Sequence, residues 1–368
     1  MKNIAVICEY NPFHNGHLYQ FRKIRDSFGD CRIISVMSGN FVQRGEPAVL
    51  DKYIRARLAV ENGADLVLEL TPPYCFAPAE IFARAGVYIA DSVGVDALVF
   101  GSEFGDTGKL RNISENLSSE TFSCALDAAV KENIHSEKSY IRIRSEVYEN
   151  LFGGSLPDTP NDILALEYLS ALRNTDIEPF AFERETGYSA GGAREAYFEN
   201  DTEKLRSLVP ENVFDLLMKD RDTAISRSAA FDKMIIYKLL SEDPGKQQFE
   251  CEECPSSLIY RLYDAAINST DLPDLVGQAN SKKYTSSRIK RALLNLLFGV
   301  RKGSYASLPE NTNLLAANGS GRSYLREISR SARINIMTKP TVSLCDELYS
   351  FASGAAASDA YRRSPYIE

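Results

Sequence analysis

The sequence lacks any apolar run long enough to cross a bilayer, and no charged segment followed by an apolar stretch precedes its first predicted strand. We therefore expect neither a membrane-spanning helix nor a signal peptide. We expect the protein to be cytoplasmic. Seven cysteines, an odd number that is mostly scattered singly, argue against a disulfide framework. Cys251 and Cys254 have the spacing of zinc ligands, but no second pair lies nearby, so we expect no structural metal.

Histidine is scarce, because the chain contains only His14, His17 and His135. His14 and His17 are three residues apart, about one helical turn, so both imidazoles can face one point at a helix N-terminus. Unpaired N–H groups and the helix dipole favour a phosphate there, and Gly16 leaves room for it. The pattern predicts a site that stabilises charge on a transferring phosphoryl group. In the alternative interpretation, one histidine caps the helix and the other is a surface residue.

Short apolar segments alternate with helical patterns along the first half of the chain. The predicted strands are Ile4–Cys8, Arg32–Met37, Ala64–Leu70, Val95–Phe100 and Ile177–Phe182. This alternation predicts an α/β fold with a doubly wound parallel sheet. Helical patterns dominate after residue 200, so we expect a catalytic domain over residues 1–198 and a mainly helical domain over residues 199–368. Ligands of such sheets bind at the carboxyl ends of strands, where His14, Ser38 and Gly101 fall.

Four segments resemble one known family. Glu9–His17 contains the His-x-Gly-His motif of the nucleotidyltransferase superfamily. Together with Met37–Pro47 it is similar to the tRNA(Met) cytidine acetate ligase family. Phe100–Glu103, and Lys283–Thr285 with Arg288–Arg291, are also similar, so the resemblance extends to about residue 300.

The resemblance implies a Rossmann-like nucleotidyltransferase domain and an ATP-dependent ligase. Such an enzyme activates acetate as acetyl-adenylate and transfers the acetyl group to N4 of the wobble cytidine of elongator tRNA(Met), giving N4-acetylcytidine. The implied cofactor is ATP with Mg²⁺ as its counter-ion. The implied partners are acetate and elongator tRNA(Met), with no membrane.

The resemblance also implies the site residues. His14 and His17 would be catalytic. The implied ATP-binding residues are Ile7, Cys8, Glu9, Tyr10, Asn11, Pro12, Phe13, His14, Asn15, Gly16, His17, Leu18, Tyr19, Gln20, Gly101, Asn161, Arg184, Glu185 and Arg194. Asn161 can instead cap the following helix. The chain departs from the superfamily pattern before Arg194, where Gly191-Gly192-Ala193 replaces Ser-Ala-Ile, and at Glu183, where lysine is usual.

A long polar loop follows the second predicted strand. Its small and polar residues permit close approach and offer donors to an anion, and the family resemblance implies that the loop lies near the acceptor. The predicted substrate-facing residues are Ser38, Gly39, Asn40, Gln43 and Arg44. The alternative is an ordinary surface loop.

Charge is unevenly distributed. The stretch from Lys282 to Arg333 carries a net charge of +9, so the rest of the chain, at −8 overall, carries −17. Cations near the start of the predicted helix that begins at Arg288 oppose the helix dipole, so a polyanionic partner explains them better. The predicted tRNA-binding residues are Lys282, Lys283, Arg288, Lys290 and Arg291. The alternative is a solvated basic face.

Two other functions remain open at this stage. A small-molecule nucleotidyltransferase would use the same site, although it would not need a second domain with a strongly basic stretch. The second alternative is an RNA-binding module with a decayed nucleotide site, which the altered turn before Arg194 favours.

Overall fold

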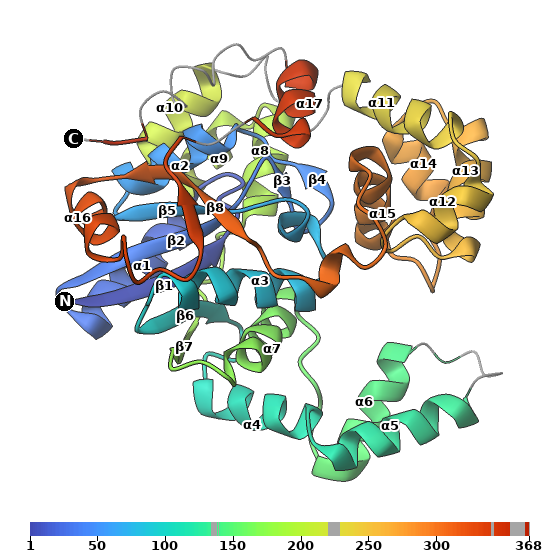
Figure 1. Ribbon diagram of the computed structural model, residues 1–368, viewed down its shortest axis with the longest axis horizontal. Helices are drawn as coiled ribbons and strands as arrows, with labels where there is room; N and C mark the ends of the chain where they lie inside the picture. Colours follow the sequence, from blue (N-terminus) through green and yellow to red (C-terminus); the bar gives the residue numbers. More distant parts are fainter. Residues whose placement is uncertain (134–137, 139, 220–228, 340–341, 354–364, 368) are drawn as a thin grey trace.

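The computed structural model describes the chain except residues 134–137, 139, 220–228, 340–341, 354–364 and 368. A seven-stranded sheet in the order β7-β6-β1-β2-β5-β8-β9 forms its centre (Figure 1). Five strands run parallel, namely β1 (Lys2–Cys8), β2 (Cys31–Ser38), β5 (Leu66–Leu70), β6 (Ala97–Ser102) and β7 (Glu178–Glu183). Because β1 lies between β2 and β6, its carboxyl end is at the point where the strand order reverses, which is where ligands of such sheets bind.

Successive residues of β1 point to opposite faces of the sheet, as strand geometry requires. Ile4 and Val6 pack in one core cluster and Ala5 packs in the other. The first face is covered by α1 (Asn15–Phe28), α2 (Lys52–Glu61), α8 (Ala190–Glu199), α9 (Thr202–Leu208) and α10 (Glu211–Lys219). The second is covered by α3 (Ala79–Ser92) and α7 (Pro160–Leu172). Helices on both faces confirm the predicted doubly wound α/β sheet.

The excursion after β6 contains three helices. They are α4 (Thr107–Leu117), α5 (Glu120–Glu132) and α6 (Tyr140–Phe152). Figure 1 shows α5 and α6 extending away from the sheet as a hairpin.

A group of helices lies to one side of the sheet (Figure 1). It consists of α11 (Ala229–Leu240), α12 (Pro244–Glu250), α13 (Ser256–Asn268), α14 (Leu272–Ala279) and α15 (Ser286–Phe298). This group confirms that a helical region follows the sheet. Thr285 caps α15 by accepting the backbone N–H of Arg288, so the helix begins two residues before the predicted start.

Ile177–Phe182 was expected to be the last strand, and this expectation is wrong. The chain returns from the helical group to add β8 (Asn311–Ala317) antiparallel to β5, and β9 (Asn335–Met337) beside β8. The segment Asn-Thr-Asn-Leu-Leu-Ala-Ala has weak strand propensity, and its place beside the open edge of β5 determines its structure. The sheet therefore draws residues from both predicted domains.

Helix α16 (Gly319–Glu327) connects these two strands, and α17 (Leu344–Ser353) follows β9. The 3₁₀ turns Tyr74–Phe76 and Ser304–Ala306 and the short hairpin of β3 (Phe41–Val42) with β4 (Glu46–Pro47) complete the described elements. None of the helices in the described ranges is long and apolar enough to span a membrane.

Candidate active site

The two histidines lie at the N-terminus of α1, beyond the carboxyl end of β1. His14 is the N-cap residue, and its Nδ1 accepts the backbone N–H of Gly16 at 3.1 Å. His17 Nδ1 accepts the backbone N–H of His14 at 3.1 Å, which closes a capping box. The rings stack with centroids 3.8 Å apart. The histidines thus cap the helix, and both also line the cavities described below.

Both imidazoles are neutral in this environment. Burial, together with the smaller effect of the charges of Arg184 and Arg194, lowers the pKa of His14 to about 3. Burial also lowers the pKa of His17 well below its usual value, as do His14 and Arg184. Because each Nδ1 accepts a backbone N–H, each ring carries its proton on Nε2. The pair therefore offers two N–H donors to an anion instead of two positive charges.

Two adjoining cavities share the histidines. The narrower one has a volume of about 140 Å³ and the wider one about 420 Å³. The predicted ATP-binding residues that line the narrower cavity are Ile7, Cys8, His14, Gly16, His17, Tyr19, Gln20, Gly101, Asn161, Arg184 and Glu185. The wider cavity is lined by six of these residues, Ile7, Cys8, His14, His17, Asn161 and Arg184, and by four more of the predicted residues, Glu9, Tyr10, Asn11 and Arg194.

Four predicted residues lie beside the cavities without lining them. Phe13 is buried in the core under α1, Leu18 packs against the same core, and Asn15 donates to the carbonyl of Ser207 at 3.0 Å. Pro12 completes the turn between Asn11 and Phe13. These residues shape the turn and the start of α1.

Asn161 faces the site, and the neighbouring Thr159 caps α7. The Thr159 hydroxyl accepts the backbone N–H of Asp162 at 3.3 Å. The Asn161 amide lines both cavities and donates to Glu103 Oε1 at 2.7 Å. The capping alternative for Asn161 is therefore wrong, because the cap is supplied two residues earlier.

Besides Arg44 of the substrate loop, two arginines supply positive charge to the site. Arg184 follows β7, and its Nε lies 4.0 Å from Glu103 Oε1. A Cβ on Gly101 would come within 2.8 Å of Arg184 Cγ, so the glycine leaves the space that the arginine occupies. Arg194 reaches back from α8 and donates through Nη1 to the carbonyl of Asn11 at 2.7 Å. Ser189 caps α8 by accepting the Gly192 N–H at 3.0 Å, so the altered turn still forms a helix N-terminus beside the wider cavity.

The predicted substrate loop divides into two parts. Gln43 and Arg44 line the wider cavity. Ser38, Gly39 and Asn40 are buried beneath it, in the part of the loop that supports the cavity wall. These three residues are buried because their polar groups form hydrogen bonds with neighbouring elements.

The sequence did not indicate Arg55, which donates several of these hydrogen bonds. Its side chain is fully buried on α2 and donates to the carbonyls of Leu50, Ser38, Gly39 and Glu9. One guanidinium thus joins the ends of β1 and β2 to the loop. No local pattern distinguishes it from an exposed arginine on a helix surface.

A buried ionic cluster below the loop was also missed. Lys52 Nζ lies 2.8 Å from Glu69 Oε1 and 2.8 Å from Asp346 Oδ1. Burial lowers the pKa of Lys52, but the two carboxylates raise it by more, so the lysine is charged. Asn40 donates to Asp346 Oδ1 at 3.0 Å, which attaches α17 to the loop. The residues come from distant parts of the chain, which conceals the cluster in the sequence.

The predicted tRNA-binding residues have different environments. Lys282 and Lys283 are exposed. Arg288 lies over the ring of Tyr284, with its Cζ 5.2 Å from the centroid. Lys290 forms an ion pair with Glu46, and Arg291 pairs with Glu253 at 3.1 Å.

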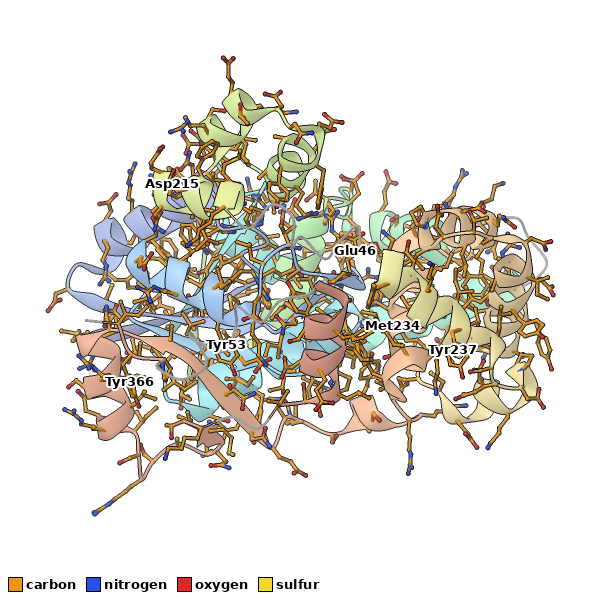
Figure 2. All side chains as sticks on the ribbon, turned by 90° about the horizontal axis from the view of Figure 1, so that it is seen from above. Glu46, Tyr53, Asp215, Met234, Tyr237 and Tyr366 are labelled. Carbon is orange, nitrogen blue, oxygen red and sulfur yellow. The ribbon has the colours of Figure 1, made fainter. Side chains whose placement is uncertain are left out.

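The last two residues therefore have partners within the protein, so their place on α15 does not by itself require a polyanion, and their contact with tRNA stays a prediction. Lys290 joins α15 to the substrate loop at β4. Figure 2 shows Glu46 on the side of the sheet that faces the helical group carrying Met234 and Tyr237.

Cys251 and Cys254 come together in the helical group, with their Sγ atoms 3.5 Å apart. Both are buried, and Cys254 donates to the carbonyl of Ala292 in α15. Across the described ranges, no three His, Cys, Asp or Glu side chains are grouped so that they could hold a metal ion.

Known proteins are similar to this chain. Residues 1–365 match the model of the family described as HIGH Nucleotidyl Transferase. The chain is 33% identical over 356 residues to the tRNA(Met) cytidine acetate ligase of Thermoanaerobacter sp. (strain X514), covering 91% of this chain and 88% of that protein. It is 34% identical over 364 residues to the enzyme of the same name from Syntrophotalea carbinolica, covering 92% and 85%.

A solved structure is also similar. It is Thermotoga maritima TmcAL bound with alpha-thio ATP, which superimposes with a TM-score of 0.83 at 27% identity and covers 98% of this chain and 94% of that one.

Proposed function

This chain belongs to the tRNA(Met) cytidine acetate ligase family of HIGH nucleotidyl transferases and is an ATP-binding ligase of that kind, and we propose that it activates acetate as acetyl-adenylate and acetylates N4 of the wobble cytidine of elongator tRNA(Met). The observation that supports this proposal best is the sharing of the histidine pair by two adjoining cavities. The narrower cavity suits the nucleotide, and the wider one leads to the substrate loop, where acetate and the cytosine can enter.

In the first step, an acetate oxygen attacks the α-phosphate of ATP and pyrophosphate leaves. His14 and His17 donate from Nε2 to the phosphate oxygens on which charge builds. Arg184 and Arg194, which line the wider cavity with them, stabilise the triphosphate and the departing pyrophosphate. Neutral histidine donors suit this task, because they need no proton from solvent at neutral pH.

Mg²⁺ would enter as the counter-ion of the triphosphate and supply Lewis-acid stabilisation of its charge. The carboxylates of Glu9 and Glu185 line the two cavities, and the described residues hold no cluster of three ligands that would bind the ion by themselves. The ion is therefore expected to arrive with ATP.

In the second step, the cytosine amine attacks the acetyl carbon of the adenylate, and AMP leaves. A base in the anticodon loop is single-stranded, so it can reach the wider cavity without being flipped from a duplex. We assign ATP activation to residues 1–198 and tRNA binding to the basic segment of residues 199–368, with Lys282, Lys283, Arg288, Lys290 and Arg291 as the phosphate contacts.

The test separates the two steps. Exchange of labelled pyrophosphate into ATP should require acetate, and formate and propionate serve as matched acids. With tRNA(Met) added, labelled acetate should appear in the tRNA, and a tRNA with uridine at the wobble position should accept none. Exchange without any acid, or with a different acid only, would contradict the proposal and indicate a small-molecule nucleotidyltransferase.

A further inference from the structure

Glu9 is a carboxylate in the wider cavity that the activation step does not use. It follows β1 directly and is partly buried. Its Oε1 accepts the backbone N–H of Gln43, from the substrate loop, at 2.9 Å. This contact orients the carboxylate and leaves Oε2 as the acceptor for a ligand.

The backbone around Glu9 is held in an uncommon conformation. Tyr10 has φ of 46°, in the left-handed region that bulky residues rarely adopt. Its hydroxyl lies 2.9 Å from Ser35 Oγ and its ring packs 4.8 Å from that of His17, while Arg55 binds the carbonyl of Glu9. Strained residues that are held so firmly occur mostly at functional sites.

Acetyl transfer to cytosine needs a group at this place. The exocyclic amine is a poor nucleophile because its lone pair is delocalised into the ring, and it must lose a proton when it is acylated. A carboxylate is the side chain that accepts a hydrogen bond from this amine. A carboxylate can also take the proton as a general base.

The other titratable side chains that line the wider cavity, its arginines aside, are unsuited to this task, and burial raises the pKa of both Tyr10 and Tyr168 well above the usual value. His14 and His17 accept backbone N–H groups at Nδ1 and carry their protons on Nε2. Burial raises the pKa of the Cys8 thiol to about 12, so it holds its proton. Glu46 is paired with Lys290.

Burial also raises the pKa of the Glu9 carboxyl, but from a much lower usual value, which makes its anion a stronger base. The Gln43 N–H and the charges of Arg194 and Arg44 act against burial and favour the anion.

We propose that Glu9 is the catalytic residue that binds the N4 amine of the cytidine and accepts its proton during acetyl transfer. This inference rests on the proposed function. N4 attacks the acetyl carbonyl carbon, the new C–N bond forms, and the bond between that carbon and the phosphate oxygen breaks. AMP leaves with the electron pair, and the proton lost from N4 passes to the Glu9 carboxylate and then to solvent. Because Oε1 accepts the backbone N–H of Gln43, one hydrogen bond positions both the substrate loop and the Glu9 carboxylate.

The test compares the two steps in Glu9→Gln and Glu9→Asp. Pyrophosphate exchange with acetate reports activation, and a single turnover of preformed acetyl-adenylate with tRNA(Met) reports transfer. In Glu9→Gln, we expect transfer to slow by about 100- to 10,000-fold and exchange to fall by a much smaller factor. Glu9→Asp, which keeps a carboxylate, should recover part of the transfer rate.

The pH profile of transfer supplies a measurement on the unaltered enzyme. The rate should rise with pH through one ionisation, and this acidic limb should disappear in Glu9→Gln. Equal losses in both steps, or a flat profile in the unaltered enzyme, would overturn the proposal. A failure of the proposed function is distinguishable, because the unaltered enzyme would then show no acetate-dependent exchange.

Discussion

His17 accepts the backbone N–H of His14 through Nδ1 at 3.1 Å, while its ring stacks on the ring of His14. One hydrogen bond therefore both caps α1 and determines which nitrogen carries the proton. The structural and the catalytic interpretations of the histidines are compatible, because each uses a different ring nitrogen. This separation makes the two roles testable.

His14→Asn should separate capping from catalysis. Asparagine is among the best N-cap residues, so α1 should begin normally and the melting temperature should stay within a few degrees of the original. The Nε2 donor is lost, and acetate-dependent pyrophosphate exchange should fall by about 100- to 1,000-fold. His14→Ala is the control that loses both roles, and it should also lose about 1 kcal/mol of stability. Unchanged exchange in His14→Asn would mean that the ring serves only as a cap.

The free energy of unfolding should depend on pH through His14. Its pKa is about 3 in the folded chain and 6.5 when unperturbed, so between these values the unfolded chain binds a proton that the folded chain does not. Stability is therefore fully present above pH 6.5 and is lost as the pH falls toward 3.

His14→Asn should make this dependence shallower by up to about 1.4 kcal/mol per pH unit. Urea midpoints of both proteins at pH 7.5, 6.5 and 5.5 provide the measurement. Identical slopes would contradict the lowered pKa.

Gly45→Ala should disturb the contact between the substrate loop and α15. Gly45 has φ of 77°, and a Cβ there would lie 2.5 Å from the backbone N of Arg291. Gly299→Ala is a matched control, because Gly299 has φ of 66° with nothing within 4 Å of the added atom. Both variants should lose about 1–2 kcal/mol of folding stability, because alanine is strained in this left-handed backbone conformation. Only Gly45→Ala should also lose acetyl transfer, and equal losses of stability and transfer in the two would contradict this.

The exposed lysines should determine the salt dependence of tRNA binding. Replacing Lys282 and Lys283 with alanine should flatten the slope of log affinity against log salt by about 1–2 units, since each phosphate contact releases counterions. Arg291→Ala should change the slope less, because Glu253 already neutralises the guanidinium. Pyrophosphate exchange should be unaffected by the lysine substitutions. If the slope changed in Arg291→Ala but not in the lysine variants, the RNA contact would lie at Arg291 and not at Lys282 and Lys283.

The sequence alone determined the elements whose residues are close together in the chain. Alternating apolar runs and helices predicted the parallel sheet, and the spacing of His14 and His17 predicted a shared position at the start of α1, because both depend on local periodicity. The similarity to the ligase family could be identified from the Glu9–His17 and Met37–Pro47 segments before the fold was known.

Tertiary structure decided what depends on contacts between distant segments. Asn311–Ala317 becomes a strand because the edge of β5 is open to it. Lys52 is buried because Glu69 and Asp346 neutralise it from other elements, and Lys290 forms an ion pair with Glu46. Glu9 is exposed to the cavity because Gln43 and Arg55 hold it there. The charge and polarity of these residues are evident in the sequence, but burial and partners, which set their energies, arise only when the chain folds.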